Sequence, residues 1–226
     1  MIVLALDTTT RAGSAAVVRD GRVVHEISGN AALSHGERLP LDLMHLLDAA
    51  DVAIGSVDLF AVASGPGSFT GLRVGIATIQ GLAMASGARV VPVSVLEALA
   101  HAAGGRVTAA WMDAQRGQVF GALYGLAGEA LAEPTSLAPA ETLASWRDLA
   151  DLASATFIGD GAVRYEAVLR AALGPSAVIL PSPLLAGIIG QMADAAPSRA
   201  VLPHAVVPVY VRRPDAEIAR AKREAS

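Results

Sequence analysis

Residues 65–75 read GPGSFTGLRVG, a glycine-rich stretch between two apolar ones. The run before it, DLFAVAS at 58–64, is typical of a buried strand, and IATIQGLAMA at 76–85 has the composition of an amphipathic helix. A strand is therefore predicted to turn here into a helix that begins at Gly71. Two interpretations of the turn stay open. It is either a loop whose free N–H groups hold a phosphate, or a tight turn whose glycines allow positive φ or close packing.

A second polar segment, Asp7-Thr8-Thr9-Thr10, follows the first predicted strand, IVLALD at 2–7. A carboxylate and hydroxyls in such a place can meet a metal-bound phosphate, although acidic residues after strands are also common in turns. A mixed sheet would bring this strand end beside the glycine-rich turn. The candidate nucleotide or anion loop comprises Asp7, Thr8, Gly65, Pro66, Gly67, Ser68, Phe69, Thr70 and Gly71.

The order of predicted elements is that of an α/β protein with two related lobes. The first lobe has strands at 2–7, 14–20, 22–28, 58–64 and 88–93 and helices at 34–50, 71–86 and after Ser94. The second has strands at 107–113, 118–125, near 156–160 and at 177–180, and helices at 140–151, 162–173 and 184–195. We expect a first lobe at 1–104 and a smaller second lobe at 105–226, which ends in a short strand around VYV and a charged tail.

Composition excludes several classes of site. The chain of 226 residues has no cysteine, so thiolate metal sites and disulfides are excluded, and its only lysine is Lys222, so a P-loop lysine is absent. A net charge of -4 and 4% aromatic residues are unfavourable for direct nucleic-acid binding. Apolar runs are too short for a membrane span, and the N-terminus lacks a signal-peptide pattern. We therefore expect a cytoplasmic protein that does not bind a membrane.

The motifs together resemble those of the bacterial TsaB (YeaZ) family. The similar segments are GPGSFTGLRVG, the DTTT start, SHGERLP (34–40), PVSVLEALA (92–100), MDAQRGQVFGALY (112–124) and VYVRRPDAEIA (209–219). The resemblance spans nearly the whole chain. It implies an actin-like (ASKHA, ribonuclease H-like) fold, in which two lobes of mixed sheets are flanked by helices.

The same resemblance implies a function. Members of this family take part in making N6-threonylcarbamoyladenosine (t6A) at position 37 of tRNA, as non-catalytic subunits that dimerise with and activate the transferase TsaD, with the ATPase TsaE. On this basis tRNA is reached indirectly through the complex. The resemblance implies no cofactor bound by this chain alone. Two further possibilities stay open: a nucleotide bound at an interface shared with a partner, and a homodimer of this chain.

The catalytic relative carries an H-x-x-E-G-H type motif, in which two histidines bind a metal. In the matching stretch Val95 and Leu99 stand in their places, and neither side chain can bind a metal. The expectation is therefore no metal site and no enzymatic activity. The alternative is an independent enzyme of the same fold, either a metallopeptidase or a small-molecule kinase that uses Asp7 and the glycine-rich turn.

The helix predicted at 71–86 is apolar nearly all round, which requires burial on more than one side. Its small residues suit a close contact with a helix of another chain. In the family that the chain resembles, the helices of the first lobe form the dimer surface. The predicted partner interface comprises Leu43, Leu47, Arg73, Gly75, Ala77, Thr78, Gly81 and Leu82.

Two weaker candidates lie in the second lobe. Asp113 and Arg116 are placed at a predicted hairpin, where they could close on a ligand or only stabilise the turn. Gly159-Asp160-Gly161 stands between a strand and a helix, so it is either a second anion loop or an ordinary turn.

Overall fold

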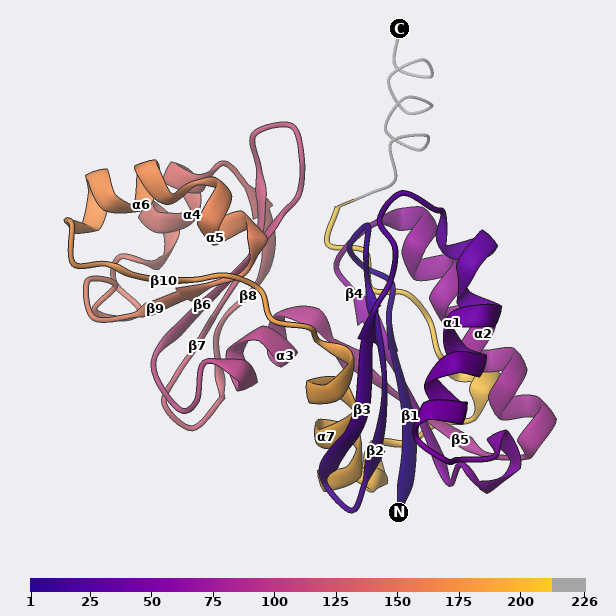
Figure 1. Ribbon diagram of the computed structural model, residues 1–226. Helices are drawn as coiled ribbons and strands as arrows, with labels where there is room; N and C mark the ends of the chain where they lie inside the picture. The colour runs from indigo at the N-terminus through magenta and orange to yellow at the C-terminus, as the bar shows by residue number, and fades with distance from the viewer. Residues whose placement is uncertain (213–226) are drawn as a thin grey trace, which may run out of the picture. The chain divides into compact units, whose positions relative to one another are not determined.

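The computed structural model describes residues 1–212 and divides the chain into two compact units (Figure 1). Unit 1 comprises Met1–Gly105 and Ser182–Pro208, and unit 2 comprises Arg106–Pro181 together with the described residues 209–212. The charged tail predicted after the last strand lies at 213–226, outside the described residues. Within 1–212, no helix combines the length and the apolar character that crossing a bilayer requires.

Unit 1 is built on a five-stranded mixed sheet with the order β3-β2-β1-β4-β5. Its strands are β1 Ile2–Asp7, β2 Ser14–Arg19, β3 Arg22–Ser28, β4 Leu59–Gly65 and β5 Arg89–Ser94. The first three are antiparallel neighbours, and β4 and β5 run parallel to β1. Asp20 (φ 51°) and Gly21 (φ 74°) form the tight turn between β2 and β3, and Asp-Gly is typical of such two-residue hairpins.

Helices cover both faces of this sheet. They are α1 His35–Ala49, α2 Phe69–Ser86, α3 Val95–Ala102 and α7 Ala186–Ala195, with short 3-10 turns η1 Ile54–Ser56, η2 Pro197–Arg199 and η3 Pro203–Ala205. Leu4 and Leu6 of β1 belong to the core that α1 and α2 close. On the opposite face α7 packs against the sheet at Gly190. The contact is so close that a Cβ at Gly190 would lie 2.6 Å from Val18 and 3.2 Å from Ala5.

Unit 2 repeats the strand topology of unit 1, with the order β10-β9-β6-β7-β8. Its elements are β6 Thr108–Asp113, β7 Val119–Tyr124, β8 Ala130–Leu137, α4 Pro139–Trp146, β9 Thr156–Ile158, α5 Asp160–Arg164, α6 Glu166–Leu173 and β10 Val178–Leu180. Its core centres on Trp111, whose ring meets that of Phe157 edge-on at 5.4 Å between centroids. The prediction of two mixed sheets flanked by helices is confirmed.

Three local predictions need correction. Strand β8 was not expected, since its sequence, ALAEPTSL, contains Pro134 and lacks alternation of apolar residues. The single helix expected at 162–173 is divided at Tyr165 into α5 and α6. The residues around VYV form no strand in the described part of the chain.

The structure also differs from the predicted lobe boundary. The first stretch of unit 1 ends at Gly105, close to the expected position, but residues 182–208 pack into unit 1 and not into the second lobe. Val206 is buried in the core beside α2, and Val201 pairs with Val90 of β5. The chain therefore leaves unit 1, builds most of unit 2 and returns.

Candidate functional site

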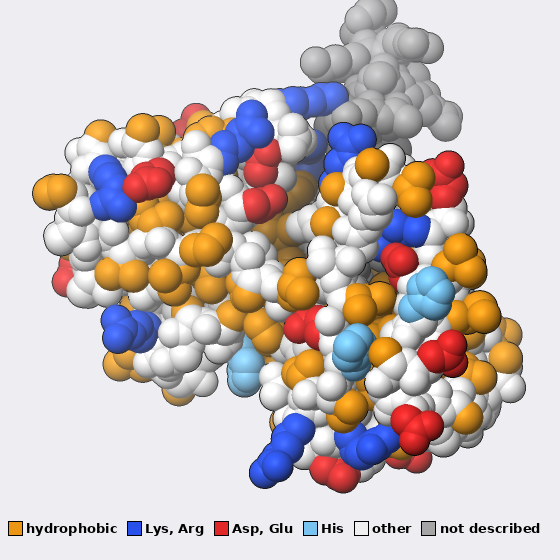
Figure 2. Space-filling view, in the orientation of Figure 1, with side chains coloured by type: hydrophobic (Ala, Val, Ile, Leu, Met, Phe, Trp, Pro, Cys, Tyr) orange, Lys and Arg blue, Asp and Glu red, His pale blue; other side chains and the backbone are white. Residues whose placement is uncertain are grey.

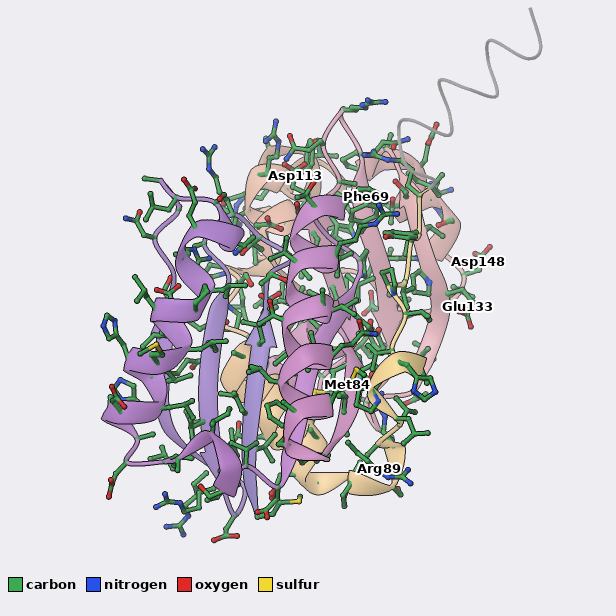
Figure 3. All side chains as sticks on the ribbon, turned by 90° about the vertical axis from the view of Figure 1, so that its right-hand side faces the viewer. Phe69, Met84, Arg89, Asp113, Glu133 and Asp148 are labelled. Carbon is green, nitrogen blue, oxygen red and sulfur yellow. The ribbon has the colours of Figure 1, made fainter. Side chains whose placement is uncertain are left out.

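The two halves of the predicted phosphate loop meet in unit 1. Because β1 and β4 are parallel neighbours, the end of β1 at Asp7 lies beside the end of β4 at Gly65. The backbone N–H of Ser68 donates to the carbonyl oxygen of Thr9 over 2.9 Å, which joins the two loops directly. Phe69, labelled in Figure 3, marks the beginning of α2.

The glycines of this junction allow close packing. A Cβ at Gly67 would lie 2.4 Å from Cβ of Thr9, and one at Gly71 would lie 2.0 Å from the carbonyl oxygen of Thr8. A Cβ at Gly75 would lie 2.1 Å from Oγ1 of Thr8. Any larger residue would push α2 away from the end of β1, so the geometry favours the tight-turn interpretation.

The polar groups expected to hold a phosphate bind groups of the chain itself. Oγ1 of Thr8 donates to the carbonyl oxygen of Gly71 (2.8 Å), and Oγ of Ser68 accepts from the N–H of Gly71 (3.2 Å). Oδ1 of Asp7 accepts from the N–H and the hydroxyl of Thr9, at 2.9 and 2.6 Å. Asp7, Thr8 and Thr9 are all buried. These contacts hold the junction together from within.

The first turn of α1 is a third component of the junction, at the beginning of the helix that the sequence predicts from residue 34. Nε2 of His35 lies 3.0 Å from the carbonyl oxygen of Thr10, and Arg38, which is 5% exposed, donates to the carbonyl oxygen of Ala12. Burial and the nearby charge of Arg38 lower the pKa of His35. The position of Arg38 directly beside the apolar residues of α1 is the sequence signal that could have indicated its contact with Ala12.

The equivalent junction of unit 2 contains the weaker candidates. Oδ1 of Asp160 accepts from the N–H of Asp113 (3.0 Å), and Nη1 of Arg164 donates to Oδ2 of Asp113 (3.0 Å). Desolvation raises the pKa of Asp160. A carboxylate thus occupies the beginning of α5, where an anion loop would need free donors. Arg116 lies in the exposed hairpin turn with φ 55°.

A partly apolar surface runs along α1 and α2. Leu41, Met44 and Met84 are 58, 59 and 66% exposed. Figure 2 shows hydrophobic side chains along the right-hand edge of the view, which is where α1 and α2 lie in Figure 1. We define the α1–α2 face by these three residues together with three further exposed positions of α2, Arg73, Ala77 and Gly81.

The predicted interface residues divide into two groups. Leu43 and Leu47 lie in the core of unit 1, and Gly75 is buried against Thr8, so the prediction for these three as surface positions is corrected. Small residues that allow contact inside a fold have the same sequence pattern as those that allow contact between chains. Arg73, Ala77 and Gly81 are exposed, whereas Thr78 and Leu82 are half-buried.

The positions of the catalytic relative's metal ligands are apolar core positions here. Val95 and Leu99 lie on α3 and are 0 and 1% exposed. Among residues 1–212, no group of three or more histidine or acidic side chains is arranged to hold a metal ion.

Comparison with solved structures identifies close structural relatives. YeaZ from Pseudomonas aeruginosa is 32% identical, with a TM-score of 0.76 over 92% of this chain and 99% of that one. An activator of a 2-hydroxyisocaproyl-CoA dehydratase from Clostridium difficile shares the fold at 10% identity, with a TM-score of 0.53 over 88% of this chain and 96% of that one. The fold is actin-like (ASKHA, ribonuclease H-like).

Sequence comparison gives the same relationship. The family model TsaD, tRNA N6-adenosine threonylcarbamoyltransferase, matches residues 23–172. The tRNA threonylcarbamoyladenosine biosynthesis protein TsaB of Bacillus subtilis is 28% identical over 96% of both chains. An uncharacterised protein of Mycobacterium leprae is 33% identical over 99% of this chain, which spans 58% of that protein's length. The chain therefore belongs to the bacterial TsaB (YeaZ) family.

Proposed function

We propose that this chain is a non-catalytic subunit for t6A synthesis, which docks on the transferase TsaD through the α1–α2 face and activates it. The observation that carries the proposal is the exposure of Leu41, Met44 and Met84 on two neighbouring helices. TsaE would join this complex, and tRNA would be bound through it. Such a subunit would work in the cytoplasm.

The size and chemistry of the face suit a helix-to-helix contact between proteins. Helices of 15 and 18 residues are about 22 and 27 Å long, enough to supply much of a typical interface of roughly 800 Å² per partner. The face combines three large apolar side chains with two exposed small residues, Ala77 and Gly81, that allow a partner helix to approach. Burying them would contribute about 25 cal/mol for each Å² of apolar surface.

The interior of unit 1 supports the non-catalytic part of the proposal. Apolar Val95 and Leu99 stand where a TsaD-like active site would need two metal-binding histidines. The hydroxyls of Thr8 and Ser68 bind Gly71, so the glycine-rich junction is occupied by its own contacts. We therefore propose that the junction positions α2 for docking, with no cofactor of the chain's own. A nucleotide at a shared interface is a separate hypothesis.

The test is a titration of the purified chain with TsaD from the same organism. We expect Met84→Arg and Ala77→Arg to weaken binding by more than about a hundredfold, since each would bury a poorly paired charge in the contact, and tenfold corresponds to about 1.4 kcal/mol. Both positions are exposed in unit 1, so circular dichroism should show unchanged folding. A t6A assay with TsaD, TsaE and tRNA should lose activity in parallel.

Leu126→Arg is the matched control, because Leu126 is 68% exposed and lies in a turn of unit 2. It should bind TsaD as the unmodified chain does. Unchanged TsaD affinity in both α2 variants would place the contact elsewhere. Stoichiometric nucleotide binding or phosphoryl transfer by the isolated chain would instead favour the independent-enzyme alternative.

A further inference from the structure

The contacts of His35 determine where its ring hydrogen lies. Nε2 lies 3.0 Å from the carbonyl oxygen of Thr10, which can only accept, so Nε2 carries the hydrogen. Nδ1 lies 2.8 Å from Nη2 of Arg38, which can only donate, so Nδ1 is an acceptor. Both contacts are satisfied together only by the neutral Nε2–H form of the ring.

Arg38 is held in place from three directions. Its guanidinium donates to the carbonyl oxygen of Ala12 and forms an ion pair with Asp42. The backbone of Gly29 packs so closely that a Cβ there would lie 2.0 Å from Cζ of Arg38. The arginine therefore cannot turn away if the charge of its histidine neighbour changes.

Protonation of His35 would place a donor against a donor. The new Nδ1–H would point at an N–H of Arg38, and two positive charges would stand at hydrogen-bond distance. The charged groups that act on His35 are Arg38 and Asp42 from α1 and Asp7 from the end of β1. Desolvation and Arg38 lower the pKa of His35, and they outweigh the Thr10 hydrogen bond and the two carboxylates, which raise it.

We propose that His35 and Arg38 form a proton-sensitive latch. Neutral His35 holds Thr10 against α1, and on protonation the repulsion from the fixed Arg38 turns the ring away, so that Thr10 is released while Ala12 keeps its bond to Arg38. The carbonyl groups of Thr10 and Ala12 are the two points of attachment. Thr8 and Thr9 stay bound to the glycine-rich junction through Gly71 and Ser68. Opening is therefore confined to the part of the loop around Thr10.

The direction of the pH effect follows from the lowered pKa. Because the folded value lies below the ordinary value of 6.5, the unfolded or released state binds the proton more readily. The stability that neutral His35 contributes is complete above that ordinary value and is lost as pH falls below it.

Nitrogen-15 NMR of the full chain tests the latch without any substitution. At neutral pH the ring of His35 should show the Nε2–H tautomer, and it should titrate below the ordinary histidine value of 6.5. An Nδ1–H tautomer, or titration at or above that value, would overturn the proposal.

Amide hydrogen exchange tests whether the loop follows the proton. The N–H of Gly13, which donates to Oγ1 of Thr10 (3.1 Å), should lose protection by at least about tenfold as His35 is protonated. The N–H of Ser68, bound to Thr9, should keep its protection factor. Protection of Gly13 that stays constant through the titration of His35 would refute the latch.

Two variants separate the proton from the hydrogen bond. In His35→Gln, the side-chain amide can donate to Thr10 and does not titrate, so Gly13 should stay protected across the whole pH range. In His35→Ala the donor is missing, and Gly13 should be unprotected at every pH. Equal, pH-dependent protection in the two variants would show that another group controls the loop.

Discussion

The same strand–loop–helix junction occurs once in each unit, and the two copies are closed by different chemistry. In unit 1, β4 reaches α2 through Gly65 (φ 121°), and in unit 2, β9 reaches α5 through Gly159 (φ 121°). Hydroxyls of Thr8 and Ser68 close the first junction. The carboxylate of Asp160 closes the second.

The difference shows how one topology can support different surfaces. The closely packed junction of unit 1 begins a helix of 18 residues that carries half of the α1–α2 face. The junction of unit 2 begins a helix of only 5 residues and places the carboxylate of Asp160 beside Asp113. An incoming phosphate would meet the carboxylate of Asp160 in unit 2, and in unit 1 the carboxylate of Asp7 and hydroxyls that are already bonded to Gly71.

The largest expected effect comes from filling the close contact in each junction. Gly71→Ala would place Cβ 2.0 Å from a backbone oxygen, and Gly161→Ala would place it 2.6 Å from the backbone carbon of Met112. Because backbone atoms cannot move aside cheaply, each change should cost about 3 kcal/mol or more. Urea unfolding followed by circular dichroism measures the loss.

Gly81→Ala is the control on the same helix as Gly71. A Cβ at Gly81 meets nothing within 4 Å, so this change should stabilise α2 by about 0.5–1 kcal/mol. Equal effects of Gly71→Ala and Gly81→Ala would mean that helix propensity, and not the approach of Thr8, determines the effect at these glycines.

A smaller effect is expected from removing one buried hydroxyl in each unit. Thr8→Val loses the bond to Gly71 and should cost about 1 kcal/mol. Oγ1 of Thr135 in β8 is buried without a partner among the described residues, so Thr135→Val should be neutral or stabilising. Thermal unfolding of the two variants compares their stabilities directly. A larger loss of stability in Thr135→Val than in Thr8→Val would contradict this prediction.

The smallest expected effect concerns the acid of unit 2. Because the pKa of Asp160 is raised in the folded state, its ionisation destabilises the fold as pH rises from the ordinary value of 3.8 through the folded value. Asp160→Asn keeps an oxygen for the N–H of Asp113 and removes that ionisation. The variant should therefore lose less stability than the unmodified chain over this range, as measured by unfolding at a series of pH values. Parallel pH profiles would assign the pH dependence to other groups.

Most of the fold was predictable because its signals are local. The Asp20-Gly21 turn, the capping box of Ser34 and Glu37, and the apolar spacing along α1 act within a few residues. Strand β8 and the placement of α7 were not predictable in this way. The sequence pattern of a helix does not indicate which of two sheets it covers. Helix α7 could therefore not be assigned to unit 1 from its own sequence.

The candidate site was predictable in its parts and not in its contacts. The sequence brought Asp7 and the glycine-rich turn together through the parallel strand order. It could not show that Thr8 binds Gly71, or that Gly75 faces Thr8 inside the core. The contribution of Arg38 was missed for a related reason, because its partner Ala12 is a backbone carbonyl, which any residue type supplies.

The return of the chain to unit 1 has a consequence for synthesis on the ribosome. Helix α7 and Val206 belong to unit 1, but they emerge only after β6–β10 of unit 2 have been made. Until then one face of the first sheet, including Ala5 and Val18, lacks its cover. During synthesis, unit 1 therefore cannot complete its fold until residues 182–208 have emerged, and its uncovered apolar surface is accessible to chaperones. The sheet of unit 2 can form before that point.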